Sequence, residues 1–125
     1  MIAITCACGN GLNYADCCKP YHTLKNIPKT AEILMRSRYS AYVLHLADYL
    51  VATIHPANRH LHKKKDILAW AKANTWVKLE ICNADDDVVE FKAYYMHHHN
   101  LEIHHERSLF KQEKGKWYYY SGTYF

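Results

Sequence analysis

The sequence lacks a long hydrophobic run and a basic leader. Its longest apolar stretches, around 42–46 and 49–54, are much shorter than the roughly 20 residues that a membrane-spanning helix needs. The apolar start of the chain ends at Thr5, whereas a secretory signal needs about 7–15 apolar residues. We therefore expect no membrane segment and no export, and we predict a cytoplasmic protein.

The sequence also lacks the common catalytic patterns. It contains no Ser–His–Asp order, no glycine-rich phosphate loop and no carboxylate pair at the spacing of a hydrolase. Its net charge of +4 is weaker than the strong basic charge of a dedicated nucleic-acid-binding domain. Charged residues make up 22% of the chain, which argues against a disordered protein. These patterns identify no enzyme, and the sequence favours a non-enzymatic role.

The hydrophobic residues are unevenly distributed. They make up 50% of the 125 residues, enough for one compact domain with a buried core. However, residues 1–22 hold almost no aliphatic side chains after Leu12 and cannot form a core alone. We predict a small motif over 1–22, a short linker around 25–28, and a larger domain over 29–125.

The first half of the larger domain has the pattern of helices. Apolar residues follow a helical period from Ala31 on, and Thr30 is placed to act as the N-cap. A break near Asp48 predicts a second helix that begins with Asp48 as its N-cap. Pro56 would end this second helix, because a residue before proline disfavours the helical conformation. A third helix is expected within 58–73.

After Asn74 the apolar period changes to two, the pattern of half-buried strands. Val77, Leu79 and Ile81 are predicted to face the core together. The short connections between successive strands indicate an antiparallel meander, and helices followed by strands define an α+β domain. The predicted strands cover 76–83, 88–96 and 101–111, with a fourth that starts at 116.

Four of the five cysteines gather in one short segment. A structural zinc site needs four tetrahedral nitrogen or sulfur ligands, and two cysteine pairs separated by a turn supply them. Gly9 and Gly11 lie between the pairs and allow the backbone to reverse through positive φ. Free thiols and a disulfide are the alternatives, but in a reducing compartment a tight cluster favours a metal. The cluster consists of Cys6, Cys8, Cys17 and Cys18.

This cysteine pattern resembles the SEC-C motif, a zinc-binding motif at the carboxyl end of the SecA translocation ATPase and in many small proteins. The resemblance implies that the four cysteines bind Zn²⁺, with iron as the alternative because four thiolates also suit it. His22 follows closely and would replace a thiolate or support the ligands from behind. SEC-C motifs are usually rich in lysine between the cysteine pairs. This chain has none there, which makes nucleic-acid or ribosome binding the disfavoured reading.

The rest of the chain resembles the central domain of the YchJ family. That resemblance implies an NTF2-like fold, in which a curved antiparallel sheet wraps around helices to form a cone. Because the family is largely uncharacterised, the resemblance implies an architecture and a metal and leaves the activity open. The matching segments are 34–42, 47–50, 55–56, 105–110 and 115–119, together with Gly122.

One charged residue lies inside the apolar stripe of the first predicted helix. Arg38 falls between Leu34 and Tyr42 on the helical wheel, and a buried guanidinium requires an acidic or carbonyl partner. Glu106 is the candidate, because it shares one face of a predicted strand with His104, Ser108 and Phe110. A buried salt bridge that only organises the fold is the favoured interpretation. The functional alternative is a pocket inside the cone, lined by Arg38, Tyr42, His55, Glu106, Phe110 and Trp117.

Two further clusters have a structural and a functional interpretation. The aromatic run 117–120 resembles a platform for stacking bases, but an ordinary strand with large residues on both faces is favoured. His97 and His99 would form a weak surface metal site with His104, but a solvated turn is favoured. Cys82 has no evident partner and is interpreted as a free thiol.

Together these patterns predict a zinc-stabilised binding module that contacts an unidentified protein partner. The first alternative is an enzyme, with His55 or Glu106 as acid or base, or a small-ligand carrier, either using the cone pocket around Arg38. The second alternative is ribosome or nucleic-acid binding through the cysteine motif. A homodimer through the sheet is also considered.

Overall fold

The computed structural model describes residues 4–125. A short 3₁₀ turn at Tyr14–Asp16 precedes helix α1 (Lys19–His22). The larger helices are α2 (Ala31–Val43), α3 (Ala47–Ala52) and α4 (Lys64–Ala73), and a 3₁₀ turn at Arg59–Leu61 precedes α4. The strands are β1 (Thr75–Asp85), β2 (Val88–His97), β3 (Asn100–Glu113) and β4 (Lys116–Tyr124). Within the described range, none of the helices has the length and apolar character to cross a membrane.

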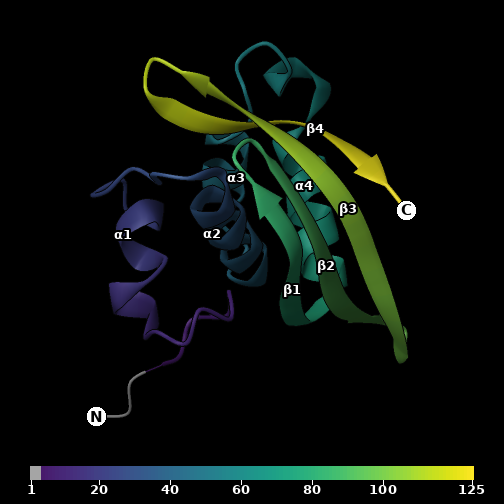
Figure 1. Cartoon of the computed structure of the whole chain (residues 1–125). Coiled ribbons are helices and arrows are strands. Elements are labelled where there is room, and N and C mark those ends of the chain that lie inside the picture. The colour runs from purple at the N-terminus through teal and green to yellow at the C-terminus, as the bar shows by residue number, and fades with distance from the viewer. Residues whose placement is uncertain (1–3) are drawn as a thin grey trace.

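The four strands form one antiparallel sheet in the order β1-β2-β3-β4. The sheet curves along one side of α2 and α4, while the N-terminal segment with α1 lies on the other side of α2 (Figure 1). Helix α2 is therefore the central element between the cysteine motif and the sheet. The predicted meander and the α+β class with helices before strands are confirmed.

Helix α2 begins as the sequence predicts and carries the core. The side chain of Thr30 accepts a hydrogen bond from the backbone N–H of Ile33 at 3.1 Å, which satisfies one of the free donors of the first turn. The helix buries Leu34 and Met35 against the sheet residues Phe91 and Phe110. This contact buries the apolar stripe of α2 and fixes the helix across the concave face of the sheet.

Two predicted helix boundaries are wrong. Leu46, not Asp48, is the N-cap of α3, and the Asp48 carboxylate instead contacts Lys64 at 2.7 Å. Helix α3 ends at Ala52, well before Pro56. The reason is tertiary, because the chain after α3 pairs with β4 through a bridge between Ile54 and Tyr119. Backbone hydrogen bonds to a strand replace those of another helical turn.

The predicted strand faces hold except at the start of β1. A register shift between Trp76 and Lys78 marks a bulge, which adds an unpaired residue and changes the side that later residues face. Val77 is 53% exposed, whereas Leu79 and Ile81 pack against the core. The inward placement predicted for Val77 is therefore wrong, and Trp76 takes that role.

The histidine turn does not form the surface metal site considered above. His98 and His99 both have positive φ and make the turn between β2 and β3. His97 contacts the side-chain oxygen of Asn74 at 3.0 Å, whereas His104 contacts Glu106 at 2.8 Å. Strand register separates them along the sheet, because His104 pairs with Ala93, four positions from the pair that His97 forms with Asn100.

The aromatic run of β4 is an ordinary strand, as favoured. Its side chains alternate in the expected way, so that Tyr119 is buried in the core. Tyr118 and Tyr120 both pack edge-on against the ring of His55. The run is thus divided between the two faces of the sheet and offers no continuous stacking surface.

Candidate functional site

The first cysteine pair lies on a small hairpin. Thr5 and Asn13 form an antiparallel bridge, and the backbone N–H of Cys6 donates to the carbonyl oxygen of Leu12 at 2.8 Å. Gly9 and Gly11 have φ of +83° and +84°, a conformation that glycine adopts without steric cost. The two glycines therefore produce the predicted reversal and direct both thiols of the first pair to one side.

The second pair lies between the 3₁₀ turn and α1, and it meets the first. All four thiols are buried, and their sulfur atoms lie within 4.8 Å of one another. The Sγ atoms of Cys8 and Cys17 are 3.5 Å apart, and those of Cys17 and Cys18 are 3.9 Å apart. A disulfide needs about 2.05 Å, so the disulfide alternative is wrong. A tetrahedral site with Zn–S bonds of about 2.3 Å has sulfur atoms about 3.8 Å apart.

The electrostatics of this cysteine cluster also fit a cation. A hydrogen bond with Cys18 lowers the pKa of the Cys8 thiol to about 5. Burial raises the pKa of Cys17 to about 12. The cluster alone therefore concentrates negative charge on one buried sulfur and keeps a neighbour protonated. A bound divalent metal deprotonates coordinating thiols, and the donor set of four sulfurs suits zinc or iron.

His22 lies outside the group of metal-ligand atoms and connects the motif to α2. Its Nε2 donates to the carbonyl oxygen of Ser37 at 2.7 Å, and its Nδ1 accepts from the Tyr14 hydroxyl at 2.8 Å. Burial lowers the pKa of His22, which favours the neutral ring that these two hydrogen bonds require. Tyr14 in turn packs against the cysteine cluster. His22 therefore links Tyr14, which packs against the cysteine cluster, to helix α2.

Arg36 provides a second connection that the sequence analysis missed. Its Nη1 donates to the carbonyl oxygen of Cys8 at 2.8 Å, and its Nε donates to Glu32 at 3.0 Å. On a helical wheel Arg36 points away from the apolar stripe of α2, and this is the direction in which the cysteine motif lies. Arg36 and Cys8 are far apart in the sequence, so no local sequence pattern predicts their contact. The contact forms only when the hairpin packs on α2.

A second group of metal-ligand side chains lies on the outer face of the sheet. Cys82, Glu90 and His105 come from three adjacent strands, and their ligand atoms lie within 4.8 Å of one another. His105 contacts Glu90 at 2.9 Å, and Cys82 is exposed. The sequence analysis found no partner for Cys82, because its neighbours depend on the sheet register and on a bulge next to it.

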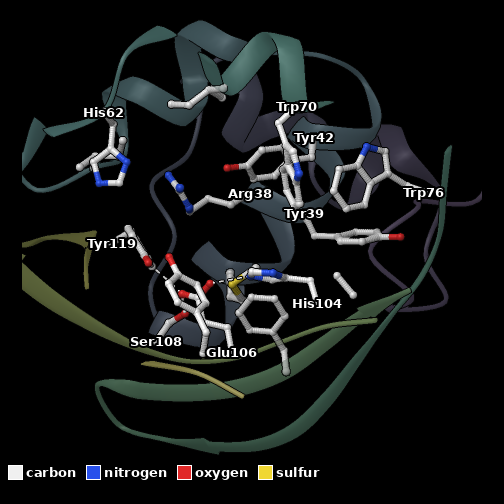
Figure 2. Close-up of a pocket in the computed structure, with 16 residues that line it drawn as sticks. Arg38, Tyr39, Tyr42, His62, Trp70, Trp76, His104, Glu106, Ser108 and Tyr119 are labelled. Atoms are coloured by element: carbon white, nitrogen blue, oxygen red, sulfur yellow. Dashed lines mark hydrogen bonds and ion pairs between the residues drawn. The ribbon is translucent and has the colours of Figure 1, made fainter. Parts of the chain in front are cut away.

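A cavity of about 270 Å³ opens between the helices and the concave face of the sheet. Figure 2 shows Trp70, Trp76 and Tyr42 on one side of the cavity and Glu106, Ser108 and Tyr119 on the other. The aromatic lining residues include Tyr39, Tyr42, Trp70, Trp76, Phe91 and Tyr119. The polar groups are Arg38, His62, His104, Glu106 and Ser108.

Glu106 lies at the base of this cavity, and both of its carboxylate oxygens form hydrogen bonds within the protein. His104 contacts Oε1 at 2.8 Å, and the hydroxyls of Ser108 and Tyr119 donate to Oε2 at 2.6 and 2.8 Å. Burial raises the pKa of Glu106, but the hydrogen bonds from these three residues hold it below its usual value. Glu106 therefore stays ionised at neutral pH despite its burial.

Arg38 does not pair with Glu106, which corrects the predicted ion pair. Its Nη1 donates to the carbonyl oxygen of Leu50 at 2.8 Å and to the Thr53 hydroxyl at 2.6 Å. The guanidinium carbon also lies 4.9 Å from the centre of the Tyr119 ring. The carbonyl partner that the sequence required is thus present, whereas the carboxylate already has its hydrogen bonds from other donors.

The structure places the remaining predicted pocket residues as follows. Tyr42 lines the cavity with Arg38 and Glu106. His55 lies on the outer side of β4 and contacts Glu113 at 3.0 Å. Phe110 is buried in the core, and the Trp117 indole nitrogen donates to the carbonyl oxygen of Lys29 at 3.2 Å. The prediction that His55, Phe110 and Trp117 line this cavity is therefore wrong.

Three important lining residues were missed by the sequence analysis. His62, Trp70 and Trp76 come from the segment before α4, from α4 and from the start of β1. The only local signal was the aromatic character of Trp70 and Trp76. Their inward position depends on how α4 crosses the sheet and on the bulge beside Trp76. The spacing of apolar residues in the sequence predicts neither of these features.

Gly122 of β4 provides the space that the Glu106 carboxylate occupies. A Cβ atom at position 122 would lie 2.6 Å from Cδ of Glu106 and 2.7 Å from the Tyr119 hydroxyl. We expect Gly122→Ala to displace Glu106 and to lower the free energy of unfolding by about 1–3 kcal/mol, as overpacking typically does. Urea unfolding measures this loss. Ser121→Ala, at the exposed neighbouring position, is the control and should change stability little.

Several known proteins resemble this chain in sequence. A family model described as "YchJ, middle NTF2-like domain" matches residues 30–122. A protein of Actinobacillus succinogenes named UPF0225 protein is 40% identical over 124 residues, which cover 94% of this chain and 80% of the relative. A UPF0225 protein of Vibrio vulnificus is 41% identical over 129 residues, which cover 98% and 77%.

Two solved structures resemble it in fold. The solution structure of a SEC-C motif-containing protein from Rhodopseudomonas palustris aligns with a TM-score of 0.91 and 34% identity, over 96% of this chain and 98% of that one. The crystal structure of a SEC-C motif-containing protein from Psychrobacter arcticus aligns with a TM-score of 0.80 and 35% identity, over 93% and 80%. Both alignments cover at least 93% of this chain, so the similarity extends into the cysteine motif.

Proposed function

The chain belongs to the YchJ family, and from this premise we propose that it is a zinc-stabilised protein that binds a small ligand in its NTF2-like domain. In this proposal Cys6, Cys8, Cys17 and Cys18 bind one structural Zn²⁺. The motif around them gains its stability from the metal, because it has no hydrophobic core of its own. The ligand occupies the cavity between the helices and the sheet.

The observation that carries the ligand proposal is the cavity itself. Its walls are mostly aromatic, and one buried cation and one buried carboxylate face it. A concave apolar site with a few convergent polar groups is the usual form of a small-molecule site. Side chains of the domain leave about 270 Å³ open, although filling that space with larger apolar residues would stabilise the core. An open cavity of this kind favours a ligand site.

The ligand proposal is tested by NMR titration of the zinc-loaded full chain with a set of small aromatic acids, amides and amines. We expect amide shifts at lining residues such as Ala93 and Trp76. Ala93→Leu should fill the cavity and abolish these shifts, whereas Lys92→Leu, on the opposite face of β2, should preserve them. If the fragments shift only residues outside the cavity, or shift the Ala93→Leu variant equally, the ligand proposal is wrong.

The protein partner expected from the sequence stays a prediction. Exposed apolar side chains on and after the cysteine motif favour it, and they are Ile4, Leu12, Leu24 and Ile27. A homodimer through the sheet and a cytoplasmic location also stay predictions.

A further inference from the structure

We propose that the ligand of the cavity is a small aromatic carboxylate, whose carboxylate group binds Arg38, Tyr42 and the ring of His62. This inference rests on the proposed function, because it assigns a chemical class to the ligand of the same cavity. It follows from which polar atoms around the cavity have partners within the protein and which do not.

Arg38 is the first of these groups. The residue is only 5% exposed, yet within the described range 4–125 it forms no ion pair with a carboxylate, and its hydrogen bonds all come from Nη1. Among the residues that the structure describes, its Nε and Nη2 atoms have no hydrogen-bond partner. Since no fully buried side-chain nitrogen or oxygen atom of the described residues lacks a hydrogen bond, these two atoms face open space in the cavity. A buried guanidinium with a free edge can hold a carboxylate by two parallel hydrogen bonds.

Tyr42 and His62 present further donors at the same end. Figure 2 shows the Tyr42 hydroxyl and the His62 ring directed toward the space beside the Arg38 guanidinium. Among residues 4–125, neither side chain has a hydrogen-bond partner, and both line the cavity with Arg38. Three side chains from α2 and from the segment before α4 thus converge with unused donors on one location.

Glu106 explains why the ligand is an anion and not a cation. Its carboxylate already accepts hydrogen bonds from His104, Ser108 and Tyr119, so it offers little to an ammonium group. An ammonium ligand would also meet the free edge of Arg38. A carboxylate instead gives Arg38 the charged partner that the protein does not supply, and desolvated ion pairs of this kind are favourable only when such hydrogen bonds form.

The aromatic rings that adjoin Tyr42 determine the shape of the ligand. The rings of Trp70 and Trp76 pack with their centres 4.9 Å apart, and the ring of Tyr42 lies 5.6 Å from each of them. Aromatic walls favour a flat apolar body, since ring pairs gain energy beyond the buried area. The volume of about 270 Å³ lies just below the roughly 300–1,000 Å³ typical of ligand pockets. The ligand is therefore small, with about one ring and one carboxylate.

Benzoate is the probe for this proposal, and benzamide, benzylamine, acetate and inorganic phosphate are the comparisons. Isothermal titration of the zinc-loaded full chain should give benzoate a Kd at least about tenfold lower than that of benzamide or benzylamine, a difference of about 1.4 kcal/mol. Acetate should bind more weakly than benzoate because it lacks the ring. The benzoate-induced NMR shifts should include Tyr42 and His62.

Variants separate the carboxylate contact from the general shape of the cavity. Arg38→Gln should remove the preference for benzoate over benzamide, and Tyr42→Phe, which deletes only the hydroxyl, should weaken benzoate about three- to tenfold. Arg36→Gln should leave benzoate binding unchanged, because Arg36 lies on the other face of α2 and contacts the cysteine motif. If Arg38→Gln does not fold, as judged by circular dichroism, Tyr42→Phe and the probe series still decide the question.

The outcomes distinguish this inference from the proposed function. Equal binding of benzamide or benzylamine with shifts inside the cavity overturns the carboxylate and leaves the ligand site intact. Binding of phosphate as tight as that of benzoate, at the same residues, overturns the aromatic part. If none of the probes shifts a cavity residue, both this inference and the proposed function fail.

Discussion

Replacing Cys6 and Cys8 together with serine is expected to abolish zinc binding and to unfold the N-terminal motif. Two of the four thiolates would be lost, and thiolate–zinc binding supplies about 10–16 kcal/mol in small zinc domains. Among residues 4–22, the buried side chains are the four cysteines, with Tyr14 partly buried against them, so no other contribution to the stability of the motif approaches this size. Native mass spectrometry should find one zinc ion in the parent protein and none in the variant.

The larger domain should survive this change with a smaller loss. It would lose contacts of the motif with α2, which include the hydrogen bond from His22 to Ser37 and that from Arg36 to Cys8. We expect a cost of about 1–3 kcal/mol in the unfolding of residues 30–122, the size of a few lost hydrogen bonds. NMR spectra should show dispersed signals for the sheet and collapsed signals for 4–22.

Cys82→Ser is the matched control, because Cys82 is the exposed thiol outside the cluster. It should keep the zinc ion and the stability of the parent protein. Zinc retained by the double variant would contradict the four-cysteine site. Complete unfolding of both parts would contradict the view that the larger domain has a sufficient core of its own.

Local patterns were enough to predict much of the fold. Thr30 signals the start of α2 through its own side chain, and the turn at Lys114 and Gly115 fixes the pairing of β3 with β4. Adjacent antiparallel strands with short turns leave little freedom in topology. The cysteine cluster was predictable for the same reason, since all its members lie within 6–18 and one turn brings them together.

The cavity was less predictable because its residues meet only through tertiary packing. The helical wheel placed Arg38 correctly among buried residues, but the partner of Arg38 depends on the carbonyl of Leu50 in another helix. The alternation of β3 placed Glu106 correctly on the inner face, but it did not reveal that Tyr119 of β4 would reach the carboxylate. Sequence periods thus predict which side chains turn inward, whereas hydrogen-bond partners among them require the folded arrangement.

Glu106→Gln is expected to destabilise the larger domain by at least about 3 kcal/mol at neutral pH. The ionised carboxylate accepts three hydrogen bonds, and hydrogen bonds to a charged group are worth about 1.5–3 kcal/mol each. The glutamine side chain has no charge, and its NH₂ group would face side chains that themselves donate hydrogen bonds, such as the hydroxyls of Ser108 and Tyr119. Urea unfolding at pH 7 measures the difference. Glu102→Gln, an exposed position on the same strand, is the control and should have little effect.

The pH dependence of this difference tests the ionised state directly. The pKa of Glu106 is lower in the folded protein than its usual value, because its three donors outweigh burial. A lowered pKa adds stability that is fully present above the unfolded pKa of about 4.3 and is lost as the pH falls through the folded pKa. The difference between parent and variant should therefore be large at pH 7 and shrink as the pH falls below the unfolded pKa. Both proteins lose any bound zinc alike in acid, so the difference isolates Glu106. A difference that keeps its full size far below pH 4 would mean that the charge of the Glu106 carboxylate does not stabilise the folded protein.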